Sequence, residues 1–505
     1  MKDRILNYIQ NFYSLGVARE LKEKHDCELY AIIDISKYQK NFFEEQKIIE
    51  FEKKWYLRDY ILPEKNEPDI EYLSNFEKKY NINLWLIAYM DRNFHEYNRY
   101  YKFNRNEILC IFEQECRIFE KILNETKPDF VITSVPDYNQ NKLLFEICKA
   151  LDIKILMLIV SRLGYRSIIS AKPDSIDYYD KINSKYLNQE QKTVEELRDY
   201  WKDYTKLQTE FRSGYRASMK KKLKSSLRYF FIVCNNEYRK YYINFGRTRT
   251  RIFINESSLY FKKLYRGMFL KKHSLHNLEN NEPYVYYPLH LDPEQSSLLA
   301  APFYNNQLNL ITNIAKSLPA EYKLYVKEHP AQVLNGWRDV SYYKNILNLP
   351  NVHLLHPSIS NHKILQNCSL VITIAGTLGF EATFYGKPTI VFTDTIFSEL
   401  PSVKKLKNLE ELPQVIRNSL KNKVEVSDLN KFVSCLEDNS FEYPSVNLEV
   451  EVQHKFFGGG FYFDFEIPLE DGLAFIEKHK PTFSRLAEEY IKKINQHKKF
   501  QLNES

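Results

Sequence analysis

The chain has 505 residues, of which 44% are hydrophobic and 15% aromatic, so it can bury two cores and is long for a single domain. Its seven cysteines are scattered and include no C-x-x-C pair, which argues against a disulfide framework or a zinc ribbon and fits a reducing cytoplasm. The opening MKDRILNYIQ has no apolar signal core, and the apolar runs 156–160 and 230–234 are too short to span a bilayer. We therefore expect a protein that is neither secreted by a standard signal nor integral to a membrane.

The first part of the chain alternates helical and extended patterns. Helices are expected at residues 15–24, 108–123 and 143–151, and strands at 29–33, 84–88, 130–133 and 155–160. The helix at 108–123 has the clearest pattern, because its large apolar side chains fall on one face. Such alternation predicts a parallel sheet covered by helices.

Two loops of this first sheet carry side chains that suit chemistry. Asp137 follows the strand at 130–133 and is the best-placed carboxylate to act as a base or nucleophile. It suits a helix cap equally well, because an aspartate just before a helix commonly accepts backbone hydrogen bonds. After the next strand, Arg166 is placed to meet an anionic donor or acceptor.

Positive charge is concentrated in one segment, residues 212–272, which we call the basic island. It holds 17 Lys and Arg against two glutamates, whereas the whole chain has a net charge of +7. Phenylalanines and tyrosines are interleaved with these charges, a combination that suits an anionic membrane surface. A set of solvated linker helices explains the charge equally well. Nucleic acid is not an expected partner, since no recognisable binding module accompanies the charge.

A second alternating set follows the basic island. Strands are expected at 284–287, 322–326, 352–355, 369–374 and 389–392, and helices at 306–318 and 362–367. After about residue 429 the pattern weakens until a terminal helix at 481–494. We therefore predict an α/β protein with two Rossmann-like domains and an interdomain cleft.

The loop after the first strand of the second set carries an imidazole and two carboxylates within a proline-stiffened stretch, PLHLDPE. His290 lies at the carboxyl end of a strand, where ligands bind in open parallel sheets, so a catalytic role and a merely hydrogen-bonded one are equally expected. The carboxylates, among them Glu294, could bind an acceptor hydroxyl, orient His290 or act as a base.

The residues of two later loops indicate a phosphate site more specifically than those of any other loop in the chain. Lys327, His329 and Pro330 follow the strand at 322–326, and an imidazole held by a proline turn beside a lysine can donate to phosphoryl oxygens. The turn AGTLG follows the strand at 369–374 and opens a helix that stops at Gly386.

In the AGTLG turn, Gly376 and Thr377 begin the helix, and free N–H groups at a helix start favour a phosphate. Glu381, one turn further on, suits ribose hydroxyls or is an ordinary surface glutamate. No Walker A loop, G-x-S-x-G elbow, H-E-x-x-H or D-x-D metal motif is visible, so an ATPase, serine hydrolase or zinc protease is disfavoured.

Taken together, YVYYPLHLDPE, LYVKEHP, NVHLLHP and VITIAGTLGFEATFYGKPTIVF resemble the capsule polysaccharide synthesis proteins. These are bacterial glycosyltransferases of GT-B type that include the β-Kdo transferases, and the similarity is clear over residues 283–400. The resemblance implies that His329, Thr373 and Thr377 hold the nucleotide phosphate of a CMP-sugar such as CMP-Kdo. It also implies a cytoplasmic enzyme, peripheral on the inner face of the cytoplasmic membrane, that acts on a lipid-linked or growing surface glycan. The N-terminal carboxylate motif of the β-Kdo transferases is not evident in this chain.

The expected parts are an N-terminal acceptor domain (1–205), basic linker helices (206–280), a nucleotide-sugar-binding domain (281–430) and a C-terminal extension (431–505). We expect a metal-independent glycosyltransferase without a cofactor, in which cationic groups stabilise the leaving nucleotide and the acceptor enters past Asp137. A teichoic-acid-like polyol phosphotransferase is the nearest alternative, since it shares a K-x-H-P element. A non-catalytic scaffold of a surface-glycan assembly complex is a third possibility, in which the basic island would be the working part.

Overall fold

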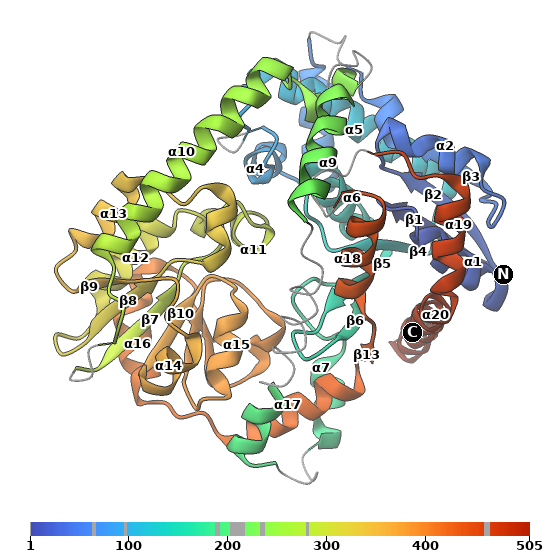
Figure 1. The fold of residues 1–505 in the computed structure, drawn as a ribbon. Helices are drawn as coiled ribbons and strands as arrows, with labels where there is room; N and C mark the ends of the chain where they lie inside the picture. Colours follow the sequence, from blue (N-terminus) through green and yellow to red (C-terminus); the bar gives the residue numbers. More distant parts are fainter. Residues whose placement is uncertain are drawn as a thin grey trace. The chain divides into compact units, whose positions relative to one another are not determined.

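The computed structural model describes residues 2–62, 67–94, 98–186, 192–201, 218–232, 238–278, 282–458 and 465–504. The chain divides into two compact units (Figure 1). Unit 1 comprises Met1–Pro173, Thr205–Arg251 and Ser440–Ser505, and unit 2 comprises Asp174–Tyr204 and Ile252–Asn439. Within the described residues, no helix is both long enough and apolar enough to cross a membrane.

Unit 1 is built on a sheet whose strand order is β13-β6-β5-β4-β1-β2-β3. The strands are β1 (Asp3–Ile9), β2 (Cys27–Ile33), β3 (Lys53–Tyr56), β4 (Phe130–Ser134), β5 (Lys154–Val160), β6 (Arg166–Ser170) and β13 (Phe441–Glu442). Strands β1 to β5 are parallel to one another. Strand β6 pairs antiparallel with β5, and β13 pairs antiparallel with β6. The order reverses between β1 and β4, which marks the ligand-binding edge of an open sheet.

Ten helices with described bounds accompany this sheet: α1 (Ser14–Lys24), α2 (Lys37–Glu45), α3 (Ile70–Tyr80), α4 (Leu84–Met90), α5 (Arg105–Thr126), α6 (Asn139–Ala150), α9 (Met219–Ile232), α18 (Ser445–Lys455), α19 (Leu469–Lys478) and α20 (Lys480–Glu504). Helix α5 shows why such segments are helical. Its apolar face is buried, Asn104 and Glu107 form a capping box at its start, and Lys127 ends it in the left-handed conformation.

Unit 2 holds a fully parallel sheet in the order β12-β11-β10-β7-β8-β9. Its strands are β7 (Tyr284–Pro288), β8 (Lys323–Lys327), β9 (Val352–Leu355), β10 (Leu370–Thr373), β11 (Thr389–Val391) and β12 (Val403–Lys405). The main helices are α10 (Arg249–His273), α12 (Gln307–Ser317), α13 (Val340–Leu347), α14 (Asn361–Asn367), α15 (Thr377–Thr383), α16 (Leu412–Lys421) and α17 (Val426–Asp438). Here the order reverses between β7 and β10.

The predicted fold class, α/β with two Rossmann-like sheets, is confirmed, whereas the cleft between them stays a prediction. One expected strand is wrong: residues 84–88 lie in helix α4. Asn83 caps that helix by accepting from the Leu86 N–H, and Trp85 and Tyr89 face solvent while Leu84 and Ile87 are buried. The burial therefore follows a helical period rather than the alternation of a strand.

The C-terminal segment is packed into unit 1 rather than extending from it. Phe475 of α19 and Phe456, which follows α18, both lie edge-on to Phe12, with ring centroids 5.6 and 5.0 Å away. Helix α20 lies so close to α1 that a Cβ added at Gly16 would stand 2.5 Å from the Phe483 ring. Contacts thus assign 440–505 to unit 1 and 174–204 to unit 2, which differs from the boundaries expected at 205 and 431.

Replacing Gly16 by valine tests this packing. Because the new side chain has to displace Phe483, we expect the free energy of unfolding to fall by about 1–3 kcal/mol. Thermal or urea unfolding measures the change. Glu23→Val on an exposed position of the same helix is the matched control, and equal stability of the two variants would contradict the close contact of α1 with α20.

Candidate functional site

The loops after β7, β8 and β10 meet at the edge of unit 2 where the strand order reverses. His290, after β7, is buried, and its Nε2 lies 3.0 Å from Thr373 Oγ1 and accepts the Ile374 N–H at 3.2 Å. A ring nitrogen that accepts a backbone N–H carries no proton, so the proton resides on Nδ1. Nδ1 faces the Glu294 carboxylate 3.8 Å away. His290 therefore fastens the β7 loop to the β10 turn, and only its Nδ1 side is directed at a carboxylate.

The turn after β10 is shaped around Gly376. Its N–H donates to Thr373 Oγ1 at 3.2 Å, so the expectation that this N–H is available to a phosphate is wrong. A Cβ at Gly376 would lie 2.6 Å from Thr373 Oγ1 and 3.2 Å from His290 Cε1. Glycine is needed here because the backbone passes directly over the His290–Thr373 contact, and a phosphate contact at this turn would have to come from residues beyond Gly376.

Lys327 and Glu381 are two largely buried ionisable groups of this edge that influence each other electrostatically. The Lys327 ammonium is buried and donates to Asn361 Oδ1 at 2.6 Å and to the Ile359 carbonyl. Burial lowers the pKa of Lys327 to about 8, although the Glu381 carboxylate opposes the shift. Burial likewise raises the pKa of Glu381 to about 7 against the effect of Lys327. Both groups therefore change charge near neutral pH, where a bound anion would favour the protonated pair.

His329 presents a hydrogen-bond donor at the same edge. Its Nδ1 accepts the Ala331 N–H at 3.2 Å and caps the short 3-10 helix Pro330–Asn335, in which Pro330 is the first residue. Burial, with smaller effects of neighbouring cations, lowers the pKa of His329, although Glu294 opposes the shift. The neutral ring thus carries its proton on Nε2, which has no hydrogen-bond partner among the described residues. This arrangement leaves an N–H able to donate to an anionic oxygen.

A buried ionic network that the sequence analysis missed holds these loops together. Arg338 donates from Nε to Glu328 Oε2 at 3.0 Å, from Nη1 to Asp292 Oδ2 at 2.8 Å, and from Nη2 to the His290 carbonyl. Glu328, fully buried, also accepts from the Tyr343 hydroxyl at 2.7 Å and from the His329 N–H at 2.8 Å. One guanidinium therefore fixes the backbone of both predicted histidines.

The charges in this network support each other. Burial opposes the charge of Arg338, but Glu328 and Asp292 outweigh it and raise the pKa of the guanidinium. Burial raises the pKa of Glu328, and Arg338 counteracts that shift. Glu328 precedes the predicted His329, but nothing in the sequence indicates that a residue ten positions later turns back to it.

In unit 1, the two candidate residues have structural partners. Asp137 accepts from Asn141 Nδ2 at 2.9 Å, and Asn141 Oδ1 accepts the Asp137 N–H at 3.1 Å, so Asp137 helps to begin α6. Burial raises the pKa of Asp137, with Asn141 opposing, which keeps a role as base open. Arg166 donates to the Ser440 hydroxyl and carbonyl, each at 2.7 Å, and thereby holds β13 against β6.

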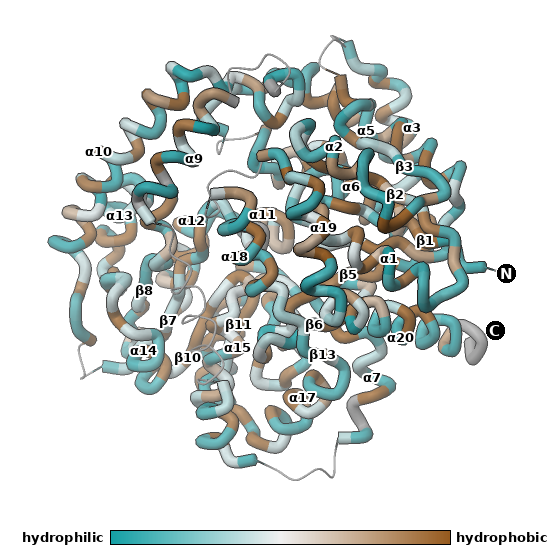
Figure 2. The backbone as a smooth tube through the Cα atoms, turned by 45° about the vertical axis from the view of Figure 1, so that its right-hand side comes forward, coloured by the Kyte–Doolittle hydropathy of each residue, from teal (hydrophilic) through white to brown (hydrophobic). Residues whose placement is uncertain are grey.

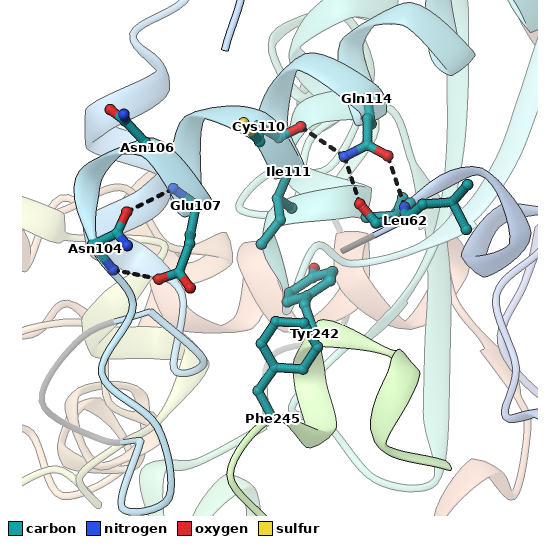
Figure 3. Close-up of a pocket in the computed structure, with 10 residues that line it drawn as sticks. Leu62, Asn104, Asn106, Glu107, Cys110, Ile111, Gln114, Tyr242 and Phe245 are labelled. Atoms are coloured by element: carbon teal, nitrogen blue, oxygen red, sulfur yellow. Dashed lines mark hydrogen bonds between the residues drawn. The ribbon is translucent and has the colours of Figure 1, made fainter. Parts of the chain in front are cut away.

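Unit 1 also contains a cavity of about 310 Å³ near the start of α5 (Figure 3). Its polar side chains are already paired: Gln114 bonds the backbone of Leu62, and Asn104 bonds Glu107. Tyr242 lines the cavity and extends its hydroxyl to Glu115 and Asn139 in a buried network. None of the predicted site residues lines this cavity, and its groups have no evident chemistry to perform.

Comparison with known proteins matches residues 208–413, which contain all six strands of unit 2, to the family described as capsule polysaccharide biosynthesis protein. This segment is similar to that family. The predicted resemblance to a capsule polysaccharide glycosyltransferase family is thereby confirmed. No curated protein sequence matches the chain.

Among solved structures, the β-Kdo 2,7 transferase of Thermosulfurimonas dismutans KpsC is 9% identical, with 85% of this chain and 90% of that chain covered and a TM-score of 0.31. The β-Kdo 2,4 transferase of the same protein is 13% identical, with 60% and 78% covered and a TM-score of 0.28. The UDP-GlcNAc 2-epimerase of Methanocaldococcus jannaschii is 13% identical, with 86% and 99% covered and a TM-score of 0.24.

Removing the central cation of the network should destabilise unit 2. In Arg338→Met, Glu328 is left buried without its cation, and we expect the free energy of unfolding to fall by about 3–5 kcal/mol. Adding Glu328→Gln should recover part of that loss, because the uncompensated charge is then gone. Urea unfolding measures both, with Arg417→Met on the exposed face of α16 as control. A stability loss in Arg338→Met no larger than in the control would disprove the network's structural role.

Proposed function

We propose that this glycosyltransferase moves a sugar from a nucleotide donor, with a CMP-sugar such as CMP-Kdo favoured, to a capsule or other surface glycan. The observation that carries the proposal is the polar edge of unit 2, where the Lys327 ammonium and His329 Nε2–H lie at the end of β8 and the turn at Gly376 follows β10, on the other side of β7. Open parallel sheets bind nucleotides at such a reversal of strand order. The donor phosphate is assigned to this edge, with Lys327, His329 and Thr377 as its proposed contacts and with Pro330, Thr373 and Gly376 shaping the loops that hold it.

Transfer requires the leaving nucleotide to gain negative charge at its phosphate. His329 donates a hydrogen bond there, and Lys327 supplies positive charge from a position screened from water, where its effect is larger than in solvent. These groups take the part that a divalent cation plays in D-x-D enzymes. Within the described residues, no group of three His, Cys, Asp or Glu side chains is arranged to hold a metal.

The remaining polar groups suit the sugar and the acceptor. The Glu381 carboxyl group has no hydrogen-bond partner among the described residues, so it can accept from ribose hydroxyls. Asp137 of unit 1, whose pKa burial raises, is proposed as the base for the acceptor hydroxyl. Glu294 and His290 form the second pair that could carry a proton, through the 3.8 Å approach of Nδ1.

The acceptor is proposed to be a lipid-linked or growing glycan, so the enzyme would work at the inner face of the cytoplasmic membrane. The described part of the basic island supports this: α9 exposes Lys220, Lys221 and Lys224 on the same short helix as Leu223 and Leu227. Lysines beside exposed apolar side chains suit anionic headgroups. Residues 212–217 and 233–237 of the island lie outside the described residues.

Replacing His329 by alanine tests the phosphate site directly. We expect transfer to be abolished and nucleotide affinity to fall about ten- to a hundredfold, the value of a hydrogen bond to a charged group. Titration calorimetry measures the nucleotide affinity, and a transfer assay with a CMP-sugar and CDP-glycerol side by side measures the turnover. Both are carried out in the presence of EDTA. His276→Ala, an exposed histidine of unit 2, is the control.

Turnover of His329→Ala at the parent rate would contradict the site, and transfer from CDP-glycerol alone would favour a polyol phosphotransferase. Complete loss of the parent's activity in EDTA, restored by magnesium, would require a metal. Absence of transfer from either donor would favour a scaffold.

Donor affinity should depend on pH through Lys327. Its pKa of about 8 means that the ammonium loses its proton as pH rises through that value, so affinity should be highest below it. Above it, affinity should fall by up to about tenfold per pH unit. Calorimetry over a pH series measures the decline. Lys327→Arg keeps its charge throughout, and a decline of the same size in this variant would show that another group is responsible.

Membrane binding through charge is tested by replacing Lys220, Lys221, Lys222 and Lys224 with glutamine. The variant should sediment less with anionic vesicles than the parent does, and this difference should be larger at low salt than at high salt. Its turnover on a soluble acceptor should persist, because none of these lysines belongs to the proposed site. The control removes the same charge from unit 2 by replacing the exposed Lys404, Lys407, Lys421 and Lys423. Equal vesicle binding by both variants, or loss of turnover in the first, would show that the island belongs to the fold or the site.

A further inference from the structure

Helix α10 has one face that packs against unit 2. Leu270 is fully buried in the hydrophobic core of unit 2. Gly267 lies against the Trp337 indole, since a Cβ there would stand 3.2 Å from its Nε1, and Leu259 fills the space beside Gly336. Arg266 donates to the Trp337 carbonyl at 3.0 Å and pairs with Asp339. This face explains why the helix is held on unit 2.

The opposite face of α10 exposes large apolar side chains that nothing in the described structure covers. We call these seven residues the apolar stripe, and each is 50–68% exposed: Phe253, Ile254, Tyr260, Phe261, Leu264, Tyr265 and Met268. Apolar positions recur along α10 in Figure 2. At about 100° per residue, the seven positions fall within an arc of about 140°, and they extend over about 23 Å of the helix. Scattered exposed apolar residues are common, but a continuous row of this length marks an interaction surface.

The charge of α10 indicates what the apolar stripe meets. The helix carries seven Lys and Arg and a single acidic residue, Glu256, and Lys271 and Lys272 continue the stripe at its C-terminal end. Pairing of two copies along the stripe would bring two such cationic helices together, which electrostatics opposes. Phenylalanine and tyrosine beside lysine is the composition of helices that lie in the boundary between lipid headgroups and acyl chains.

We propose that α10 lies in the plane of an anionic membrane with its apolar stripe inserted below the headgroups. This deepens the membrane attachment proposed above, because it replaces adsorption by charge alone with insertion at named residues. It does not depend on the identity of the donor or on transfer.

Insertion at α10 would also place the donor site relative to the lipid surface. The buried face of the helix holds residues 336, 337 and 339, which flank Arg338, and Arg338 fixes the loops of His290 and His329. The links from the apolar stripe to the proposed phosphate site lie within unit 2. A lipid-linked acceptor would thus meet a donor site held at a set distance from the membrane.

Insertion is measured with one added tryptophan, whose fluorescence is the difference between each variant and the parent with its four native tryptophans. Phe261→Trp places an indole in the apolar stripe, and brominated phosphatidylcholine in vesicles that also contain phosphatidylglycerol should quench its fluorescence on contact with the acyl chains. Phe303→Trp, at an 81% exposed position away from α10, is the matched control and should not be quenched. Equal quenching of the two reporters, or none for Phe261→Trp, would overturn the proposal.

Binding is measured by sedimentation with vesicles of phosphatidylglycerol and phosphatidylcholine in equal amounts. Phe253→Ser and Phe261→Ser should each lower the vesicle partition coefficient about tenfold, the value of one buried aromatic ring, whereas Phe303→Ser should not. Part of the parent's binding should survive high salt, because insertion is not screened. Binding that vanishes at high salt, or a parent dimer that dissociates in Phe261→Ser without any change in vesicle binding, would assign the stripe to another role.

Discussion

The geometry of the candidate site depends on one buried guanidinium. Arg338 joins Glu328, Asp292 and the His290 carbonyl, and these belong to the loops after β7 and β8. A buried charge left without its partner costs several kcal/mol, so each of these loops has little freedom to move without the others. The effect of this network is to hold the backbone of His290 and His329 at the edge of the sheet, where the His329 ring can serve a ligand.

The same constraint separates two histidines that looked alike in the sequence. Both follow a strand of unit 2 and both lie near a carboxylate. In His290, Nε2 accepts the Ile374 N–H and contacts Thr373 Oγ1. In His329, Nδ1 accepts the Ala331 N–H. The first ring therefore joins two loops of the protein, and the second directs an N–H away from the backbone that holds it. Which nitrogen each ring uses internally decides which one can serve a ligand.

The sequence predicted five of the six strands of unit 2, β7 to β11, because each is a short and largely apolar run; it did not predict β12, whose three residues include two lysines. It did not predict β1, since DRILNYI mixes charged and polar side chains with apolar ones although the strand lies inside the sheet. The site residues were found where a motif placed them at strand ends. The partners of these residues were not found. Arg338 contacts Glu328 because tertiary packing sets the path of the turn between them, and a local sequence pattern cannot predict that path.

The central claim is that the edge of unit 2 binds the phosphate of a nucleotide. A ligand that binds only the folded state raises the unfolding temperature by mass action, so a thermal-shift series with CMP, CDP, UDP and GDP tests the claim without knowledge of the acceptor. We expect cytidine nucleotides to raise the unfolding temperature of the parent protein, and CMP to do so more than UDP or GDP. No shift with any of the four nucleotides would contradict it.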